Sequence, residues 1–225
     1  MPEVPVLDYA AVLAAVSPAD AIERTREAFL RHRRGDWVMP PKVYLASPGC
    51  GDFRAMPARG DGLAMLKWIS SFPGNPAHGL ATVMGVVVLS DAQTSEPLAL
   101  LDARAVTALR TGAVAAVAAG ALAGAGSDAA LTQPAASSGI VGCGLHGAWA
   151  ARCLVAAGFE RGVCFDPRAA VAGALADELG DGWTSGSLRE ALDCELVTCV
   201  TPGTTAVVDV ADLRPGAHFN MLSRQ

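Results

Sequence analysis

Three glycines provide the clearest chemical pattern in this chain. Gly142, Gly144 and Gly147 have the G-x-G-x-x-G spacing and directly follow an apolar segment, residues 139–141. In such a turn the first glycine permits the tight bend, the second lets a pyrophosphate approach the backbone, and the third lets helix and strand pack closely. The N-terminus of the next helix then offers free N–H groups and the positive end of its dipole to phosphates. The spacing predicts a dinucleotide site.

An acid follows at the distance that this site requires. Asp166 lies 19 residues after Gly147, at the end of a second apolar segment. A carboxylate at the carboxyl end of that strand can accept hydrogen bonds from both ribose hydroxyls. The alternative is an ordinary glycine-rich turn between a strand and a helix, with Asp166 facing solvent.

Lysine is rare in this chain, since only Lys42 and Lys67 occur among 17 basic residues. Lys67 interrupts residues 63–69 (LAMLKWI), which are otherwise apolar on both faces of a strand. An unpaired buried ammonium is costly, so this side chain must reach a carboxylate, a cavity or the strand end. A desolvated ammonium can lose its proton, which a guanidinium cannot. Lys67 is therefore a candidate for proton transfer; the alternative is a lysine that extends to the surface.

Two further segments carry candidate site residues. The helix expected after Asp102 should be interrupted at residues 110–112 and resume as an alanine-rich helix. A helix N-terminus beside Arg110 and Thr111 would bind an anion, whereas the alternative is a kink at Gly112. Thr201 follows the strand expected over residues 195–200, at the carboxyl end where open α/β sheets bind ligands.

The order of elements predicts two domains. A capped helix over residues 18–34 and strands over 42–45, 53–56, 63–69, 82–89 and 97–101 indicate an α+β domain. A polar, proline-containing stretch at residues 127–138 separates it from alternating strands and helices, which are typical of an α/β, Rossmann-type domain. We place the boundary between residues 127 and 128.

Composition excludes several classes of protein. The 225 residues are 52% hydrophobic and 17% charged, with a net charge of −5. These values argue against disorder, a nucleic-acid surface and a basic membrane anchor. The six cysteines form no C-x-x-C pair and the four histidines are scattered, so we expect no metal site. No secretory signal pattern begins the sequence, and we expect a cytoplasmic protein.

Six segments occur in an order that is characteristic of one family. They are FRAMPA (53–58), KWISSFPGNP (67–76), ALRTGA (108–113), GIVGCGLHG (139–147), VTCVTP (197–202) and PGAHFN (215–220). Through them the chain resembles the ornithine cyclodeaminase/μ-crystallin family, which also contains alanine dehydrogenases and ketimine reductases. The resemblance implies a substrate-binding and dimerisation domain over residues 1–127 and a Rossmann NAD-binding domain over residues 128–225.

The resemblance also implies roles for individual residues. Lys42, Lys67 and Arg110 would bind the carboxylate of a small amino or imino acid, and the protein would be a homodimer. The residues that would hold NAD are Thr111, Gly142, Gly144, His146, Gly147, Asp166, Thr201 and Asn220.

One segment departs from the family pattern. After Asn220 the family continues into a Gly-Ala-Asp segment whose aspartate takes part in catalysis, whereas this chain ends at Gln225. The resemblance therefore predicts a shortened Rossmann domain that is incomplete at its C-terminus. Two functions follow: an NAD-dependent oxidoreductase or deaminase acting at Cα of a small amino acid, or a nucleotide-binding homologue with little or no catalytic activity.

Overall fold

The computed structural model describes residues 3–122, 136–201 and 206–222. The chain divides into two compact units: Met1–Ser17 with Arg26–Thr107, and Pro18–Thr25 with Ala108–Gln225. The boundary expected between residues 127 and 128 lies outside the described residues.

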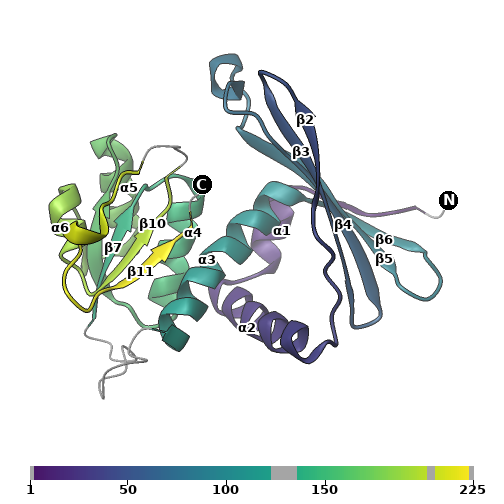
Figure 1. Cartoon of the computed structure of the whole chain (residues 1–225), viewed down its shortest axis with the longest axis horizontal. Helices are drawn as coiled ribbons and strands as arrows, with labels where there is room; N and C mark the ends of the chain where they lie inside the picture. The colour runs from purple at the N-terminus through teal and green to yellow at the C-terminus, as the bar shows by residue number, and fades with distance from the viewer. Residues whose placement is uncertain (1–2, 123–135, 202–205, 223–225) are drawn as a thin grey trace. The chain divides into compact units, whose positions relative to one another are not determined.

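The first unit is built on a six-stranded sheet with the order β1-β6-β5-β4-β3-β2. All neighbouring strands are antiparallel except β1 and β6, and the sheet is visible in Figure 1. Its elements are β1 (Val6–Leu7), α1 (Tyr9–Ala15), β2 (Val43–Ser47), β3 (Gly51–Gly60), β4 (Leu63–Ser71), η1 (Asn75–His78), β5 (Val83–Asp91) and β6 (Pro97–Asp102). Two longer helices, α2 (Pro18–Arg34) and α3 (Ala103–Leu122), contribute residues to both units.

The two faces of this sheet differ in burial. Ile69 and Val87 are buried on one face, in a cluster with Ala103 of α3. Side chains alternate between faces along a strand, and on the other face Leu66 and Trp68 are 38% and 37% exposed. The sheet therefore has one covered face and one apolar face that is open.

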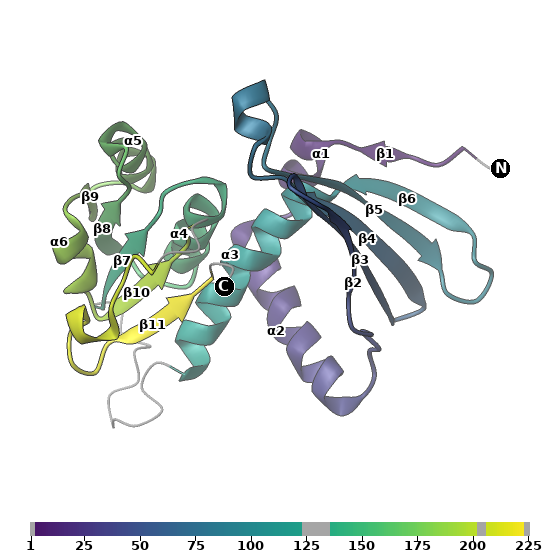
Figure 2. The ribbon, with the colours of Figure 1, turned by 45° about the horizontal axis from the view of Figure 1, so that its top comes forward.

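The second unit contains a five-stranded sheet with the order β11-β10-β7-β8-β9, and every pair is parallel. Its elements are β7 (Ser137–Val141), α4 (Leu145–Ala156), β8 (Arg161–Phe165), α5 (Ala169–Leu179), β9 (Trp183–Ser185), α6 (Leu188–Leu192), β10 (Leu196–Cys199), η2 (Val210–Asp212) and β11 (His218–Met221). Figure 2 shows this strand order. The chain adds strands outward from β7 on one side and then on the other, which is the doubly wound arrangement of a Rossmann fold. The predicted α/β class is confirmed.

The core of this sheet explains its apolar sequence. Ile140, Val141, Leu196 and Val197 are completely buried. Helices follow the parallel strands, and strands buried on both faces need a continuous apolar run rather than an alternating one. The sequence indicated β7 and β10 in this way, but it gave no sign of β9, which has only three residues.

Helix α3 corrects one prediction. It runs without interruption through Arg110, Thr111 and Gly112, because its many alanines are the strongest helix formers. A Cβ added at Gly112 would lie 2.4 Å from the backbone oxygen of Trp149 on α4. Gly112 therefore allows two helices to touch and does not break one. The N–H groups of residues 110–112 lie inside a helix, so the predicted helix N-terminus and its anion site are wrong.

The same helix has the length and composition of a membrane span. However, 56% of its apolar window is buried within the protein, and Ala108, Ala113, Ala115 and Ala119 are completely buried. Such burial is what the core helix of a globular unit shows.

The two glycines of α3 provide a matched test. We expect Gly112→Ala to lower the free energy of unfolding by about 1–3 kcal/mol, since the new Cβ collides with the Trp149 carbonyl. Gly120 is exposed with nothing near its Cβ position, so Gly120→Ala should raise stability by about 0.5–1 kcal/mol. Urea unfolding measures both. Equal effects of the two substitutions would contradict the proposed helix contact.

Candidate functional site

The turn between β7 and α4 has no room for side chains at two positions. Gly142 has a φ of +94°, and its N–H donates to the Phe165 oxygen at 2.8 Å. A Cβ at Gly147 would lie 1.8 Å from the Gly142 oxygen. A positive φ is costly for residues other than glycine, and a contact of 1.8 Å is a collision. Both glycines are therefore required by the backbone path itself.

Gly144 has a different role in the same turn. It is the N-cap residue of α4, with φ −70° and ψ −170°, and no side chain caps this helix end. These angles suit any residue, and a Cβ at Gly144 would have nothing within 4 Å. The fold does not need glycine here. Its absence of a side chain instead leaves the helix N-terminus accessible, which is what an anion requires.

Asp166 directly follows β8 and is held against this turn. Its Oδ2 accepts a hydrogen bond from the Cys143 N–H at 3.0 Å, and its Oδ1 accepts one from the Arg168 N–H at 3.0 Å. The guanidinium of Arg168 also donates to both oxygens, at 2.9 and 3.2 Å. The Arg168 side chain and these N–H groups lower the pKa of Asp166. Asp166 is 7% exposed, so the alternative of a solvent-facing acid is wrong.

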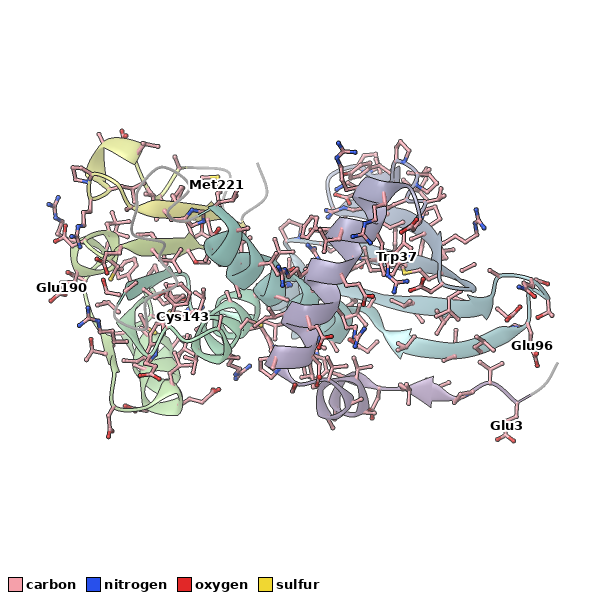
Figure 3. The ribbon with its side chains drawn as sticks, turned by 90° about the horizontal axis from the view of Figure 1, so that it is seen from below. Glu3, Trp37, Glu96, Cys143, Glu190 and Met221 are labelled. Carbon is pink, nitrogen blue, oxygen red and sulfur yellow. The ribbon has the colours of Figure 1, made fainter. Side chains whose placement is uncertain are left out.

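Two thiols lie beside this carboxylate. The Cys143 thiol donates to the Phe165 oxygen at 3.4 Å, and Figure 3 labels Cys143 among the side chains of the second unit. A hydrogen bond with Cys143, together with burial, raises the pKa of Cys164. The Cys164 thiol therefore stays uncharged, whereas Asp166, with its lowered pKa, carries a charge.

Thr201 and Asn220 belong to the neighbouring strands of the sheet. Thr201 follows β10, and its methyl group is 3.3 Å from the Cβ position of Gly142. Asn220 is buried on β11, where its Nδ2 donates to the Ala115 oxygen of α3 at 3.1 Å. Its Oδ1 lies 2.9 Å from His218 Nε2. The Asn220 side chain thus joins the sheet to α3, a role that the sequence did not indicate, and its contact with a cofactor stays a prediction.

Helix α3 and the first turn of α4 hold three more expected residues. Arg110 is exposed, whereas Thr111 is 7% exposed. The Thr111 hydroxyl has no hydrogen-bond partner within the described part of the chain, so it could bind a ligand without breaking an internal bond. His146 is half-buried in the first turn of α4.

In the first unit, the lysines share one face of the sheet. Lys67 is 7% exposed and lies opposite Met56 and Val87 in the strand register. Both neighbours belong to the covered apolar face. The Nζ of Lys42 lies 5.6 Å from the centre of the Tyr44 ring. Tyr44 is aligned through β3 with Ile69, so its side chain lies on the same face of the sheet as that of Lys67.

Arg54 is a third basic residue on this face, and our sequence reasoning missed it. It lies opposite Tyr44 and Ile69 in the register and donates to Asp52 at 2.5 and 3.2 Å. Its guanidinium is 5.6 Å from the centre of the Tyr44 ring. The signal was present, since Arg54 interrupts an apolar strand as Lys67 does.

The structure brings together one set of the expected residues. The glycine turn, Asp166 and Thr201 lie at the carboxyl edge of the parallel sheet, after β7, β8 and β10 respectively, and the strand order reverses between β7 and β10. That position is the ligand site of open α/β sheets. Lys67 and Arg110 belong to different units, so their sharing of one cavity stays a prediction.

The lowered pKa of Asp166 makes stability depend on pH. A folded-state pKa below the unfolded value of about 3.9 adds stability above that value and loses it as pH falls through the folded pKa. We expect Asp166→Asn to cost about 1–3 kcal/mol at pH 7, because its amide meets N–H donors. The difference from wild type should be constant down to about pH 5 and shrink below about pH 4.

Thermal unfolding of wild type and Asp166→Asn between pH 3 and pH 7 measures this difference in stability. Asp181→Asn is the control, since Asp181 is exposed and should change stability by less than about 0.5 kcal/mol. A cost for Asp166→Asn that is the same at pH 3 and pH 7 would show that the charge of Asp166 does not stabilise the turn.

Known proteins are similar to this chain over nearly its whole length. Alanine dehydrogenase of Archaeoglobus fulgidus is 35% identical over 222 residues, which is 96% of this chain and 66% of that protein. The solved structure of an archaeal alanine dehydrogenase dimer with bound NAD matches with a TM-score of 0.85 and 32% identity, over 96% of this chain and 66% of that one.

The third similarity is to the Δ1-pyrroline-2-carboxylate reductase of Thermococcus litoralis, solved in complex with NADH and L-proline. It matches with a TM-score of 0.87 and 25% identity, over 98% of this chain and 69% of that one. Residues 4–224 match the model of one family, the same family that the six segments indicate. The chain belongs to the ornithine cyclodeaminase/mu-crystallin family.

Proposed function

We propose that this chain is an NAD-dependent oxidoreductase that acts at Cα of a small amino or imino acid. One observation carries the proposal: a glycine turn, an uncapped helix N-terminus and a buried carboxylate meet where the strand order of a parallel sheet reverses. Phosphates and ribose hydroxyls are the groups that these features recognise.

The second unit has side chains and backbone groups of the types that bind NAD. Gly144 leaves space beside the N–H groups of α4, and Asp166 is charged at neutral pH because its pKa is lowered. Thr111 supplies a buried hydroxyl that has no internal hydrogen bond in the described chain. We infer that these residues hold NAD together with Gly142, Gly147, His146, Thr201 and Asn220.

NAD, when bound, supplies a hydride acceptor at its nicotinamide ring, and NADH supplies the hydride for the reverse reaction. The chain must provide the rest: it must orient the substrate and move a proton at the substrate nitrogen. Lys67 has the residue type for that proton transfer, and it lies opposite Val87 on the covered face of the sheet.

Basic residues would hold the substrate carboxylate. We propose Lys42, Lys67 and Arg110 for this contact, and the structure adds Arg54 as a candidate because it shares a sheet face with Lys67. Two or more cations on one carboxylate would fix its orientation and leave Cα as the reacting atom.

The reaction class has three alternatives within this family. After hydride transfer from Cα to NAD has given an imine, attack by water with loss of ammonia would give a 2-oxo acid and NADH, as in a dehydrogenase. Attack by the substrate's own side-chain amine, loss of the α-amino group as ammonia and return of the hydride would give a cyclic amino acid, as in a cyclodeaminase. A reductase would instead transfer the hydride of NADH to Cα of an imine. The chain spans 66% of the length of the alanine dehydrogenase that it resembles, and the activity of the whole protein is part of this proposal.

We also propose a homodimer that forms through the open face of the first unit. The apolar and exposed side chains on that face include Val43, Leu45, Leu66, Trp68 and Met84. The rings of Phe53 and Trp68 stack there at 5.4 Å and line a shallow groove. Apolar patches of this kind are covered in assemblies, and the similar alanine dehydrogenase was solved as a dimer. Sedimentation equilibrium gives the oligomeric state directly.

The proposed function is tested by NADH titration followed by a substrate screen. We expect quenching of protein fluorescence by NADH, then NAD reduction with L-alanine, release of ammonia from L-ornithine without net NAD reduction, or NADH oxidation with Δ1-pyrroline-2-carboxylate. Binding without turnover of any of these would support the inactive nucleotide-binding homologue instead. Absence of NADH binding would end both hypotheses.

A substitution at Lys67 distinguishes the contribution of the first unit from that of the second in this assay. Lys67→Met keeps an unbranched side chain of nearly the same length but removes the titratable amine, so kcat/KM should fall by about 10²–10⁴. The affinity for NADH should stay within about twofold, since the glycine turn lies in the other unit. Full turnover by Lys67→Met would remove Lys67 from the reaction.

A further inference from the structure

The carboxylate of Asp166 is saturated with hydrogen bonds in this structure. A carboxylate has about four lone-pair positions, two on each oxygen. Oδ1 accepts from the N–H and the Nε of Arg168. Oδ2 accepts from the Cys143 N–H and from the second guanidinium nitrogen of Arg168. No position is left for a ribose hydroxyl.

The four bonds divide into two kinds. Two come from backbone N–H groups, that of Cys143 in the glycine turn and that of Arg168 at the N-cap of α5, where the chain path fixes them. The other two come from the guanidinium of Arg168, whose side chain is 68% exposed while that of Asp166 is 5% exposed. Water can replace the protein around an exposed arginine, so the guanidinium can leave while the backbone bonds remain.

The departure of the guanidinium would open one lone pair on each oxygen of Asp166. Two neighbouring hydroxyls, such as those of a ribose, need one acceptor each. The carboxylate is thus prepared for a ribose by its backbone bonds and blocked by its side-chain partner.

We propose that Arg168 is an internal competitor for the ribose site and sets the choice between NAD and NADP. The inference rests on the proposed nucleotide site. Arg168 weakens NAD by occupying the carboxylate that the 2′-hydroxyl needs. Once released, its guanidinium remains two residues from Asp166 and offers a planar pair of donors that suits a 2′-phosphate. Both effects act in the same direction, so this chain discriminates against NADP less than Asp166 alone would.

Binding of NADH and NADPH to three proteins tests the proposal. These are wild type, Arg168→Ala and Arg214→Ala, each titrated by fluorescence and by calorimetry. Arg214 is the matched control, because it also pairs with an acid, Glu195, from an exposed position. Glu195 accepts from the Ser137 N–H at the start of β7, so this pair lies at the opposite edge of the sheet from Asp166.

We expect Arg168→Ala to bind NADH about three- to tenfold more tightly and NADPH about tenfold more weakly than wild type. Arg214→Ala should leave the ratio of the two affinities within about twofold of wild type. Arg168→Lys keeps the charge without the two-pronged donor, so it should tighten NADH and retain part of the NADPH affinity. Thermal unfolding without nucleotide checks the fold of each variant, and Arg168→Lys answers the question if Arg168→Ala does not fold.

The contrary outcomes are distinct. An unchanged ratio of NADH to NADPH affinity in Arg168→Ala, or weaker NADH binding, would overturn the role of Arg168 while leaving the nucleotide site intact. Failure of wild type to bind either nucleotide would overturn the proposed function itself.

Discussion

The second unit depends on one backbone contact, the approach of the helix α4 to the end of strand β7. The Gly142 oxygen lies where a Cβ of residue 147 would be, so strand and helix can meet only if that position is glycine. The same turn presents the Cys143 N–H to the Asp166 carboxylate, which ties β8 to β7 beyond their ladder. A bond to a charged acceptor is among the stronger hydrogen bonds in a protein. The close contact between Gly142 and Gly147 therefore also positions the N–H group that binds Asp166 at the candidate site.

Other parts of the second unit support that turn from the side. Helix α3 packs on α4 through Gly112 and contacts β11 through the amide of Asn220. It thereby holds in place the helix that follows β7 and the strand that pairs with β10. In the first unit, a covered sheet face carries Lys67 among apolar side chains, where an ammonium is retained only for a reason such as a ligand or an ion pair. Each unit thus holds polar groups whose burial is costly, and such groups are common at functional sites.

Much of this could be predicted from the sequence, because glycine spacing and apolar runs report on local backbone geometry. The strands flanking the turn, the start of α3 after Asp102 and the position of Asp166 follow from such local signals. The interruption of α3 was wrong because a glycine inside a helix can serve either a kink or a helix contact, and only its neighbour Trp149 distinguishes them. Likewise Asn220 lies 105 residues from the carbonyl that it contacts, and the pairing of Arg168 with Asp166 depends on side-chain geometry. Pairings of this kind cannot be found from spacing.

The central claim, that the glycine turn is a dinucleotide site, is tested most directly at Gly144. Its backbone angles suit any residue, and a Cβ there meets no protein atom within 4 Å. The measurement is the dissociation constant of NADH for Gly144→Val beside wild type, with the free energy of unfolding of both. The account predicts stability within about 1 kcal/mol of wild type and NADH binding weakened more than about tenfold, because the valine would occupy the space of the pyrophosphate. Equal NADH affinity in a stable Gly144→Val protein would contradict it.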